Sequence, residues 1–421
     1  MISKKINKID LTYYYEQLSN GFKIYYLNVP NKKEYMVTLV TKYGSNNNEF
    51  NVNNKAYKKP LGIAHFLEHK NFEQESGEKP FEFYEKSGSM VNASTSFDYT
   101  AYYCAGTTNF KENLEYLLKF VSEPYYTDEN VEKEQGIIAQ ELKMYNDNPE
   151  EILVRTLRES VFHNKPVKYD IGGTVDTIKE ITKEDLYDCY NTFYSPNNMY
   201  LVITGNFDKD EAHNIIMKSN YATKNNVEFK LPEIKENDKV VVKNKTITGD
   251  IAVDKLLIGI KINRDTLGKT DDKEKRLYIK IIENLLFGRT SEFLEEAHLN
   301  NLFTYFEQYT SKVDNYTVLI LNAITTEKDK LLKKIEQTLE NIKIDESSFE
   351  RIKKVLLADY IKGSESVEEM NFDLMMDELE NEEIEDNYYE TVKNLDYSTL
   401  LNILNKIDFT NKSVIIMEKN N

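Results

Sequence analysis

The chain has 421 residues, 40% of them hydrophobic and 30% charged, so it can bury a sizeable core, and its length suits two or three domains. Its 71 acidic and 54 basic residues give a formal net charge of −17. This charge argues against binding to nucleic acid and to an anionic membrane surface, because both require a basic face on the protein.

The two cysteines, Cys104 and Cys189, are too few for a disulfide scaffold, and we expect both to be reduced thiols. The first residues include basic side chains but lack the apolar segment of a signal peptide. No apolar run reaches the roughly 18 residues that a membrane-spanning helix needs. We therefore expect a soluble protein of the cytoplasm.

Alternating and periodic apolar residues predict that the first half starts with strands, continues with helices and closes with a strand. The runs Phe22–Leu27 and Tyr35–Thr41 alternate as strands do. A polar run over residues 45–59 is expected to be a loop, and residues 62–72 are expected to form a helix. The elements expected next are a helix at 81–87, strands at 89–97 and 99–106, helices at 110–121, 128–147, 150–162 and 182–193, and a buried strand at 199–204.

The second half repeats this order of elements after a polar, weakly periodic stretch. The elements expected there are a strand at 255–261, helices at 272–286 and 290–298, strands at 303–311 and 315–324, helices over most of 327–406, and a strand at 413–417. We therefore predict an α+β fold of two structurally related domains, 1–225 and 249–421, joined by a linker at 226–248. Each domain is expected to be a mainly antiparallel sheet packed by helices.

Residues 65–69 read His-Phe-Leu-Glu-His within one of the predicted helices. His65 and His69 are one helical turn apart, so both imidazoles project from the same face. Catalytic zinc sites use imidazole nitrogens among three protein ligands and keep one water. Glu68 lies beside the two histidines, where its carboxylate can take a proton from that water.

The alternative explanation is that two histidines share a helix by chance. Only five histidines occur in the chain, and their frequency, combined with that of acidic residues, gives about 0.01 chance matches to the pattern in the whole sequence. The sequence therefore predicts a metal site at His65 and His69.

A third ligand has to come from another element, and the helix predicted over residues 128–147 carries two candidates. Glu134 and Glu141 are seven residues apart, which places them on one face, two turns from each other. A single glutamate on a helix is more often a solvated surface charge. Spacing alone therefore does not select Glu141 as the ligand.

Three segments in combination resemble the pitrilysin, insulin-degrading enzyme and mitochondrial processing peptidase family of zinc peptidases, whose signature is the inverted motif H-x-x-E-H. They are GIAHFLEH (62–69), GSMVNASTSFDYTAYY (88–103) and VEKEQGIIAQELKMYNDNP (131–149). The resemblance is greatest to the single-unit bacterial branch that is similar to processing proteases. It implies that the chain forms half of a clam-shell peptidase.

The resemblance also implies roles for the candidate residues. His65, His69 and Glu141 match the ligands of one zinc ion per chain, and Glu68 matches the general base that activates water. Glu134 matches an acidic residue that supports the site behind the ligands.

Substrate contacts are implied in both halves of the chain. Asn92 and Ala93 match a pair on an edge strand, to which the family binds its substrate as an added strand. Family members often carry an Arg and a Tyr in the second domain that contact the substrate near the scissile bond. The corresponding stretch here, 291–309, has no Arg, and Tyr305 or Tyr309 could replace the tyrosine.

The length equals one two-domain unit, whereas large family members join two such units around the substrate. The resemblance therefore implies a dimer around a chamber that admits short or unfolded peptides, with either a second copy or a related, inactive subunit. Our main hypothesis is a zinc endopeptidase. The alternative is a non-catalytic scaffold or partner subunit of the same fold, and a metal enzyme of another hydrolytic type would explain the pentapeptide alone.

Overall fold

The computed structural model describes residues 1–6 and 9–420 and divides into two compact units. Unit 1 comprises Met1–Lys143, Asp170–Glu233 and Tyr360–Tyr388. Unit 2 comprises Met144–Tyr169, Ile234–Asp359 and the chain from Tyr389 onward. Among the helices of the described residues, none is both long enough and apolar enough to cross a membrane.

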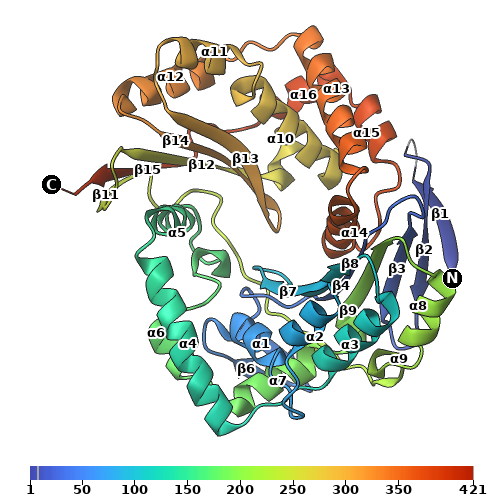
Figure 1. Ribbon diagram of the computed structural model, residues 1–421. Helices are drawn as coiled ribbons and strands as arrows, with labels where there is room; N and C mark the ends of the chain where they lie inside the picture. The colour runs from blue at the N-terminus through green and yellow to red at the C-terminus, as the bar shows by residue number, and fades with distance from the viewer. Residues whose placement is uncertain (7–8, 421) are drawn as a thin grey trace. The chain divides into compact units, whose positions relative to one another are not determined.

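Unit 1 is built on a seven-stranded sheet with the strand order β1-β2-β3-β9-β4-β8-β7 (Figure 1). Neighbouring strands are antiparallel except β3 and β9, which are parallel. The strands are β1 (Ile2–Ile6), β2 (Leu11–Gln17), β3 (Lys23–Asn28), β4 (Tyr35–Thr41), β7 (Met90–Thr95), β8 (Thr100–Gly106) and β9 (Met199–Gly205). Among the residues that the structure describes, β7 has a partner strand on one side only, so it is an edge strand.

Helices cover both faces of this sheet, because its central strands are apolar along their whole length. In β9, Leu201 and Ile203 belong to one buried cluster, whereas Tyr200 and Val202 belong to another. The helices of unit 1 are α1 (Ile63–Asn71), α2 (Pro80–Lys86), α3 (Phe110–Ser122), α4 (Asp128–Asn146, ending in unit 2), α6 (Val175–Lys179), α7 (Lys183–Phe193), α8 (Lys209–Ile216), α9 (Asn220–Thr223) and α14 (Val367–Asn381).

Unit 2 contains a five-stranded sheet with the order β11-β15-β12-β14-β13. Its strands are β11 (Asn244–Gly249), β12 (Lys255–Asn263), β13 (Tyr305–Val313), β14 (Tyr316–Ile324) and β15 (Lys412–Lys419). Its helices are α5 (Pro149–Val161), α10 (Asp272–Phe287), α11 (Glu292–Leu299), α12 (Lys328–Glu340), α13 (Glu346–Gly363, ending in unit 1), α15 (Tyr388–Asn394) and α16 (Tyr397–Leu404).

The two sheets share one topology. In unit 1 the run β3-β9-β4-β8-β7 has a first pair that is parallel and then only antiparallel pairs, and β11-β15-β12-β14-β13 in unit 2 has the same pattern. In both runs the strand that comes last in the chain lies between the two that come first: β9 lies between β3 and β4, and β15 lies between β11 and β12. The prediction of an α+β fold with two related, mainly antiparallel domains is thus confirmed.

The structure corrects the expectation of a loop over residues 45–59. This stretch contains β5 (Glu49–Val52) and β6 (Lys55–Lys58), which form a small sheet with β10 (Phe229–Lys230). Asn53 and Asn54 connect β5 and β6 with positive φ angles of 51° and 64°, a conformation that asparagine tolerates in tight hairpins. The strands are short and polar, so their alternation gives little signal in the sequence.

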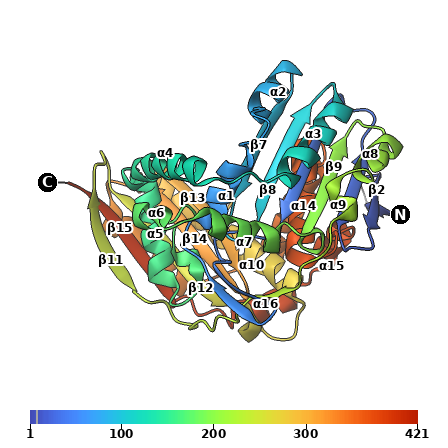
Figure 2. The ribbon, with the colours of Figure 1, turned by 90° about the horizontal axis from the view of Figure 1, so that it is seen from below.

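The two units interleave along the chain, unlike the contiguous domains 1–225 and 249–421 expected from composition. Helix α5 comes from the first half of the sequence but packs on β12 and β15 of unit 2. Helix α14 comes from the second half and packs on β4 and β9 of unit 1 (Figure 2). An apolar helix face shows in the sequence that the helix is buried, but not which sheet buries it.

Helix α14 is fixed to the unit 1 sheet through a buried carboxylate. Glu378 is fully buried, and its Oε1 accepts hydrogen bonds from the Nζ atoms of Lys23 and Lys42, both at 2.8 Å. The hydroxyl of Tyr25 donates to Oε2 at 2.5 Å. Burial disfavours the charged form of Glu378, but the two lysines and this hydrogen bond outweigh it and lower its pKa.

Replacing Glu378 by glutamine is expected to reduce the free energy of unfolding by about 2–3 kcal/mol at pH 7, because two lysines then lose their buried counterion. A lowered pKa means that the contribution is complete above the ordinary value of 4.5 and is lost as pH falls through the folded-state value. Urea denaturation at several pH values measures this. Glu382→Gln is the control, because Oε1 of Glu382 lies 3.9 Å from Nζ of Lys42 but the Glu382 side chain is exposed. Equal losses in both variants would contradict the prediction.

Candidate metal and active site

Helix α1 carries the two histidines on its polar side. The ring centroids of His65 and His69 are 4.6 Å apart, and the ring planes meet at 70°. Ile63, Phe66 and Leu67 of the same helix are fully buried in the core of unit 1. The apolar side therefore holds the helix while the other side presents both imidazoles.

Close backbone packing fixes the N-terminal end of α1. Gly62 precedes the helix with a φ of 90° and without a capping side chain. A Cβ atom on Gly62 would lie 2.3 Å from the carbonyl oxygen of Gly172, and one on Gly173 would lie 2.4 Å from the carbonyl oxygen of Leu61. The loop that contains Gly172 and Gly173 therefore lies directly against the start of the helix, at a distance that only glycine permits.

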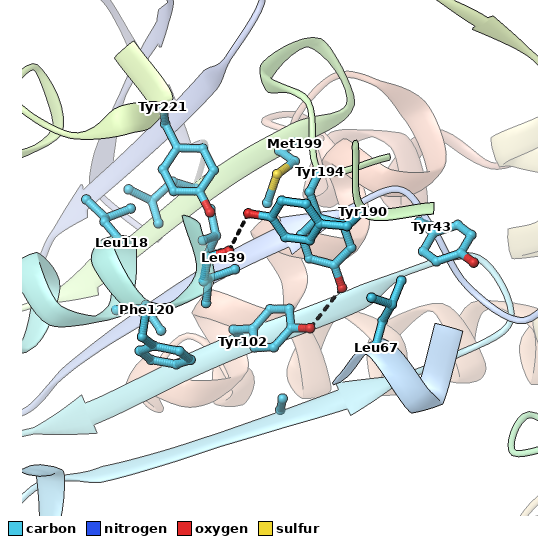
Figure 3. Packing of buried hydrophobic residues seen from close by; sticks show 14 of the residues in the cluster. Leu39, Tyr43, Leu67, Tyr102, Leu118, Phe120, Tyr190, Tyr194, Met199 and Tyr221 are labelled. Atoms are coloured by element: carbon cyan, nitrogen blue, oxygen red, sulfur yellow. Dashed lines mark hydrogen bonds between the residues drawn. The ribbon is translucent and has the colours of Figure 1, made fainter. Parts of the chain in front are cut away.

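A buried hydrogen-bond network fixes the C-terminal end of α1. Asn71 is the last residue of the helix, and its Nδ2 donates to the hydroxyl of Tyr102 at 2.8 Å. The hydroxyl of Tyr126 donates to Oδ1 of Asn71 at 2.6 Å, and the hydroxyls of Tyr102 and Tyr194 are 2.8 Å apart. Figure 3 shows Tyr102 and Tyr194 among the buried side chains of this core. Helix α1 is thus restrained at both ends.

Helix α4 brings two carboxylates to the histidines. Oε1 of Glu141 is 3.9 Å from Nε2 of His65, and its Oε2 is 3.6 Å from Nε2 of His69. Oε1 of Glu134 is 3.0 Å from Nδ1 of His69. Glu141 therefore faces Nε2 of both rings, whereas Glu134 contacts Nδ1 of His69.

The donors of His65, His69 and Glu141 suit a zinc ion. One ligand atom of each residue lies within 4.8 Å of the other two. Ligands of tetrahedral zinc stand about 3.3 Å apart, so small side-chain adjustments would complete the geometry. Because the carboxylate of Glu134 accepts the proton on Nδ1 of His69, the lone pair of that ring lies on Nε2, toward Glu141.

The pKa values of the histidines follow from burial and from the neighbouring carboxylates. Burial, together with the charge of His69, lowers the pKa of His65 to about 4, so this ring is neutral at pH 7. Burial also disfavours the charged form of His69, but the hydrogen bond to Glu134 and the charges of Glu134 and Glu141 raise its pKa. Burial disfavours the charged form of Glu134 as well, but the hydrogen bond with His69 and the charges of His69, Lys70 and Lys133 together outweigh burial and lower the pKa of Glu134.

Glu68 lies outside this group of metal donors but beside it on α1. Its Oε2 accepts a hydrogen bond from Oγ1 of Thr95 at 2.6 Å. Burial raises the pKa of Glu68, and the hydrogen bond from the Thr95 side chain opposes that rise. A hydrogen-bonded carboxylate next to two histidines that could bind a metal is the arrangement that a general base requires.

Asn92 and Ala93 lie on β7, at the edge of the unit 1 sheet. The side chain of Asn92 is exposed, whereas Ala93 is buried on the opposite face of the strand. The backbone N–H of Ala93 donates to Oδ1 of Asn92 at 2.9 Å. Helices α1 and α2 pack against this strand, so the site histidines and the sheet edge belong to one rigid part of unit 1.

Tyr305, the candidate substrate contact in the second half, begins β13 in unit 2. It is exposed, and its hydroxyl donates to Oε2 of Glu307 at 2.7 Å. It therefore belongs to a different unit from the other predicted site residues. His298 is exposed on α11.

Sequence reasoning did not identify Thr95 or the two glycines at 172–173. Thr95 comes two residues after Ala93, so the alternation of a strand would have placed both on the face toward α1. A Gly-Gly pair between two predicted helices would have indicated a close backbone approach, although not its partner. Cys104 and Cys189 are both free, as expected, and both are buried.

Two family models match the chain in succession. Residues 23–175 match the model described as Insulinase (Peptidase family M16), and residues 180–356 match the model described as Peptidase M16 inactive domain. A relative from Bacillus subtilis (strain 168), named uncharacterized zinc protease YmfH, is 38% identical over 338 residues, which cover 78% of each chain. The chain therefore belongs to peptidase family M16, the insulinase family, and its resemblance to the pitrilysin family is confirmed.

Solved structures share the fold over the whole chain. An M16-like peptidase from Alicyclobacillus acidocaldarius matches with a TM-score of 0.92 and 28% identity over 100% of both chains. The periplasmic protease PqqL from Escherichia coli matches 100% of this chain with a TM-score of 0.78 and 19% identity, but only 48% of PqqL is covered. The fold of this chain therefore also occurs as about half of a longer protease.

Replacing Gly62 by alanine is expected to lower the free energy of unfolding by at least about 2 kcal/mol, because a Cβ there meets backbone atoms at a positive φ. Zinc affinity should also fall by about tenfold, since the first turn of α1 carries His65. Denaturation and competition with a chelating dye measure the two effects. Gly77→Ala is the control: Gly77 has a φ of 76° and nothing within 4 Å of its Cβ position. Equal effects of the two substitutions would show that packing at Gly62 is unimportant.

Proposed function

We propose that this chain is a zinc-dependent endopeptidase that hydrolyses short or unfolded peptides. The observation that carries the proposal is the convergence of His65, His69 and Glu141, with the separate carboxylate of Glu68 beside them. A zinc peptidase needs both parts: three protein ligands that hold the metal, and a separate carboxylate that transfers protons.

In this mechanism, His65, His69 and Glu141 hold one zinc ion per chain, which would polarise the scissile carbonyl and make the attacking water more acidic. Glu68 accepts the proton of that water and delivers it to the leaving amine. Glu134 does not take part in the chemistry. It keeps His69 in the tautomer that presents Nε2, so it is a positioning residue.

The substrate binds as an added strand on β7. This strand has an unpaired side, and Asn92 covers the N–H of Ala93 with its own side chain. Such a side-chain contact protects an exposed sheet edge from unwanted pairing. When an extended peptide binds, its backbone replaces the Asn92 side chain as the partner of the Ala93 N–H. Backbone pairing favours extended and unfolded peptides and places few demands on their sequence.

The active form is a dimer in which two chains of this kind enclose the substrate. The match to 48% of PqqL supports this proposal, since one fold of this size makes up only about half of that protease. The partner is a second copy or a related, inactive subunit. Sedimentation analysis of the protein alone and with a co-expressed related chain tests it, and a fully active monomer would contradict it.

A non-catalytic scaffold of the same fold is the second candidate. Two observations favour it: the stretch 291–309 lacks an arginine, and residues 180–356 match a domain described as inactive. However, the metal-binding candidates all lie within residues 23–175, where the match is to the insulinase model. The second match therefore does not remove any residue from the proposed mechanism.

Metal content and peptide cleavage distinguish the two functions. The purified protein is expected to contain about one zinc ion per chain and to cleave unstructured peptides from a fluorogenic library. Chelation should abolish cleavage, and added zinc should restore it. Bound zinc without cleavage, alone or with a co-expressed partner, would identify the scaffold function. Absence of zinc binding would refute the metal site itself.

A further inference from the structure

Thr95 connects the candidate general base to the edge strand. It is the last residue of β7, and its Oγ1 is 2.6 Å from Oε2 of Glu68. Within residues 1–6 and 9–420, the Thr95 hydroxyl has one other hydrogen-bond contact, with Oγ1 of Thr100 at 3.4 Å. Thr100 donates its own proton to the carbonyl oxygen of Tyr43 at 2.9 Å. The single hydroxyl proton of Thr95 is therefore directed at the carboxylate.

The hairpin that carries Thr95 is rigid. Thr95 pairs with Thr100 at the end of the β7–β8 ladder, immediately before the connecting turn. Backbone hydrogen bonds join this turn to the loop after β4: Ser45 donates to Ser96 at 3.1 Å, and Asn46 donates to Phe97 at 2.8 Å. Thr95 therefore presents its hydroxyl from a fixed support.

A carboxylate at the end of a glutamate side chain turns freely about its last bond unless donors fix it. The hydroxyl of Thr95 is such a donor, and its bond to Oε2 restrains the Glu68 carboxylate. With one oxygen engaged by Thr95, the other is left to face a reacting water. A displacement of about 1 Å in a catalytic group can cost about a hundredfold in rate, so such a restraint has a measurable effect.

We propose that Thr95 is the positioning residue of Glu68, so that the strand that receives the peptide also orients the base. This inference rests on the proposed peptidase function. It assigns Thr95 a role in the rate of the chemical step rather than in metal binding. Among the hydrogen bonds of the described residues, none joins Thr95 to His65, His69 or Glu141.

The test compares Thr95→Val, which keeps the branched shape but removes the hydroxyl, with Thr95→Ser, which keeps the hydroxyl. Thr95→Val is expected to lower kcat by about 10- to 100-fold, with KM and zinc affinity changed by less than about twofold. Thr95→Ser should restore kcat to within about threefold of the wild-type value. Thr107→Val, at an exposed position after β8, controls for the loss of a threonine hydroxyl.

Crystal structures of the zinc-loaded wild type and Thr95→Val provide a readout that does not depend on activity, and the Glu68 carboxylate is expected to be ordered only in the wild type. A rise in KM at constant kcat, or an unmoved Glu68 in Thr95→Val, would overturn the proposal. If Thr95→Val is as active as the wild type while Glu68→Gln is inactive, Thr95 has no positioning role but the peptidase assignment holds. If the wild type cleaves no peptide, the proposed function fails and the structural comparison still decides whether Thr95 orders Glu68.

Discussion

Glu68→Gln is expected to keep its zinc and to lose peptide hydrolysis, with kcat about 10³-fold lower than in the wild type. Glutamine has the same shape, and its amide oxygen can still accept the hydrogen bond from Thr95, so the local structure should persist. The amide cannot, however, take a proton from water at neutral pH. Zinc should remain bound because Glu68 lies outside the donor group of His65, His69 and Glu141.

Zinc content by atomic emission and steady-state kinetics on one unstructured peptide measure this prediction. Glu132→Gln is the matched control, because Glu132 is an exposed glutamate on α4 and its substitution makes the same change of charge. Its kcat should stay within about twofold of the wild type. Full activity in Glu68→Gln would assign proton transfer to another group, and loss of zinc would mean that Glu68 is itself a ligand.

Glu141→Gln is expected to weaken zinc binding by more than about 10³-fold, whereas Glu134→Gln should weaken it by only about 10- to 100-fold. The difference follows from geometry, because Glu141 faces Nε2 of both histidines and Glu134 contacts only the outer Nδ1 of His69. Losing Glu141 removes one of the three ligands, and the only one of them that carries a negative charge. Losing Glu134 leaves all three ligands in place, but the tautomer and the orientation of the His69 ring are then no longer fixed.

Competition with a chelating dye gives both affinities, and denaturation of the metal-free variants shows whether each remains folded. The exposed Glu132→Gln again serves as the control for a lost negative charge on α4, with zinc affinity within about twofold of the wild type. Equal losses in Glu134→Gln and Glu141→Gln would contradict the separate roles. Retention of tight zinc binding in Glu141→Gln would remove this residue from the ligand set.

Local patterns in the sequence are sufficient to predict most of the helices and strands that carry the site residues. Helix α1 was expected at 62–72 and observed at Ile63–Asn71, and helix α4 was expected at 128–147 and observed at Asp128–Asn146. Their apolar periodicity and end signals lie within one short stretch of chain. The spacing of His65 and His69 also depends only on the geometry of a single helix.

Contacts between distant segments could not be derived in this way. The spacing of Glu134 and Glu141 does not show which of them is the metal ligand. Only the resemblance to the family predicts Glu141. In the structure, α4 is oriented so that Glu141 faces both histidines and Glu134 faces one from behind. The orientation of one helix against another depends on packing over the whole core, which no local pattern encodes.

The sequence by itself determined that unit 1 carries a helix with two imidazoles on one face and an adjacent carboxylate, because these positions follow from one helical turn. It also determined the α+β class and the repeat of strands and helices in the two halves. Only the tertiary structure decided which glutamate approaches the histidines, that Thr95 holds Glu68, and that α5 and α14 each pack in the unit built mainly from the other half of the chain. These contacts join residues far apart in sequence, and their geometry is set by how apolar surfaces pack together rather than by the residues at either end.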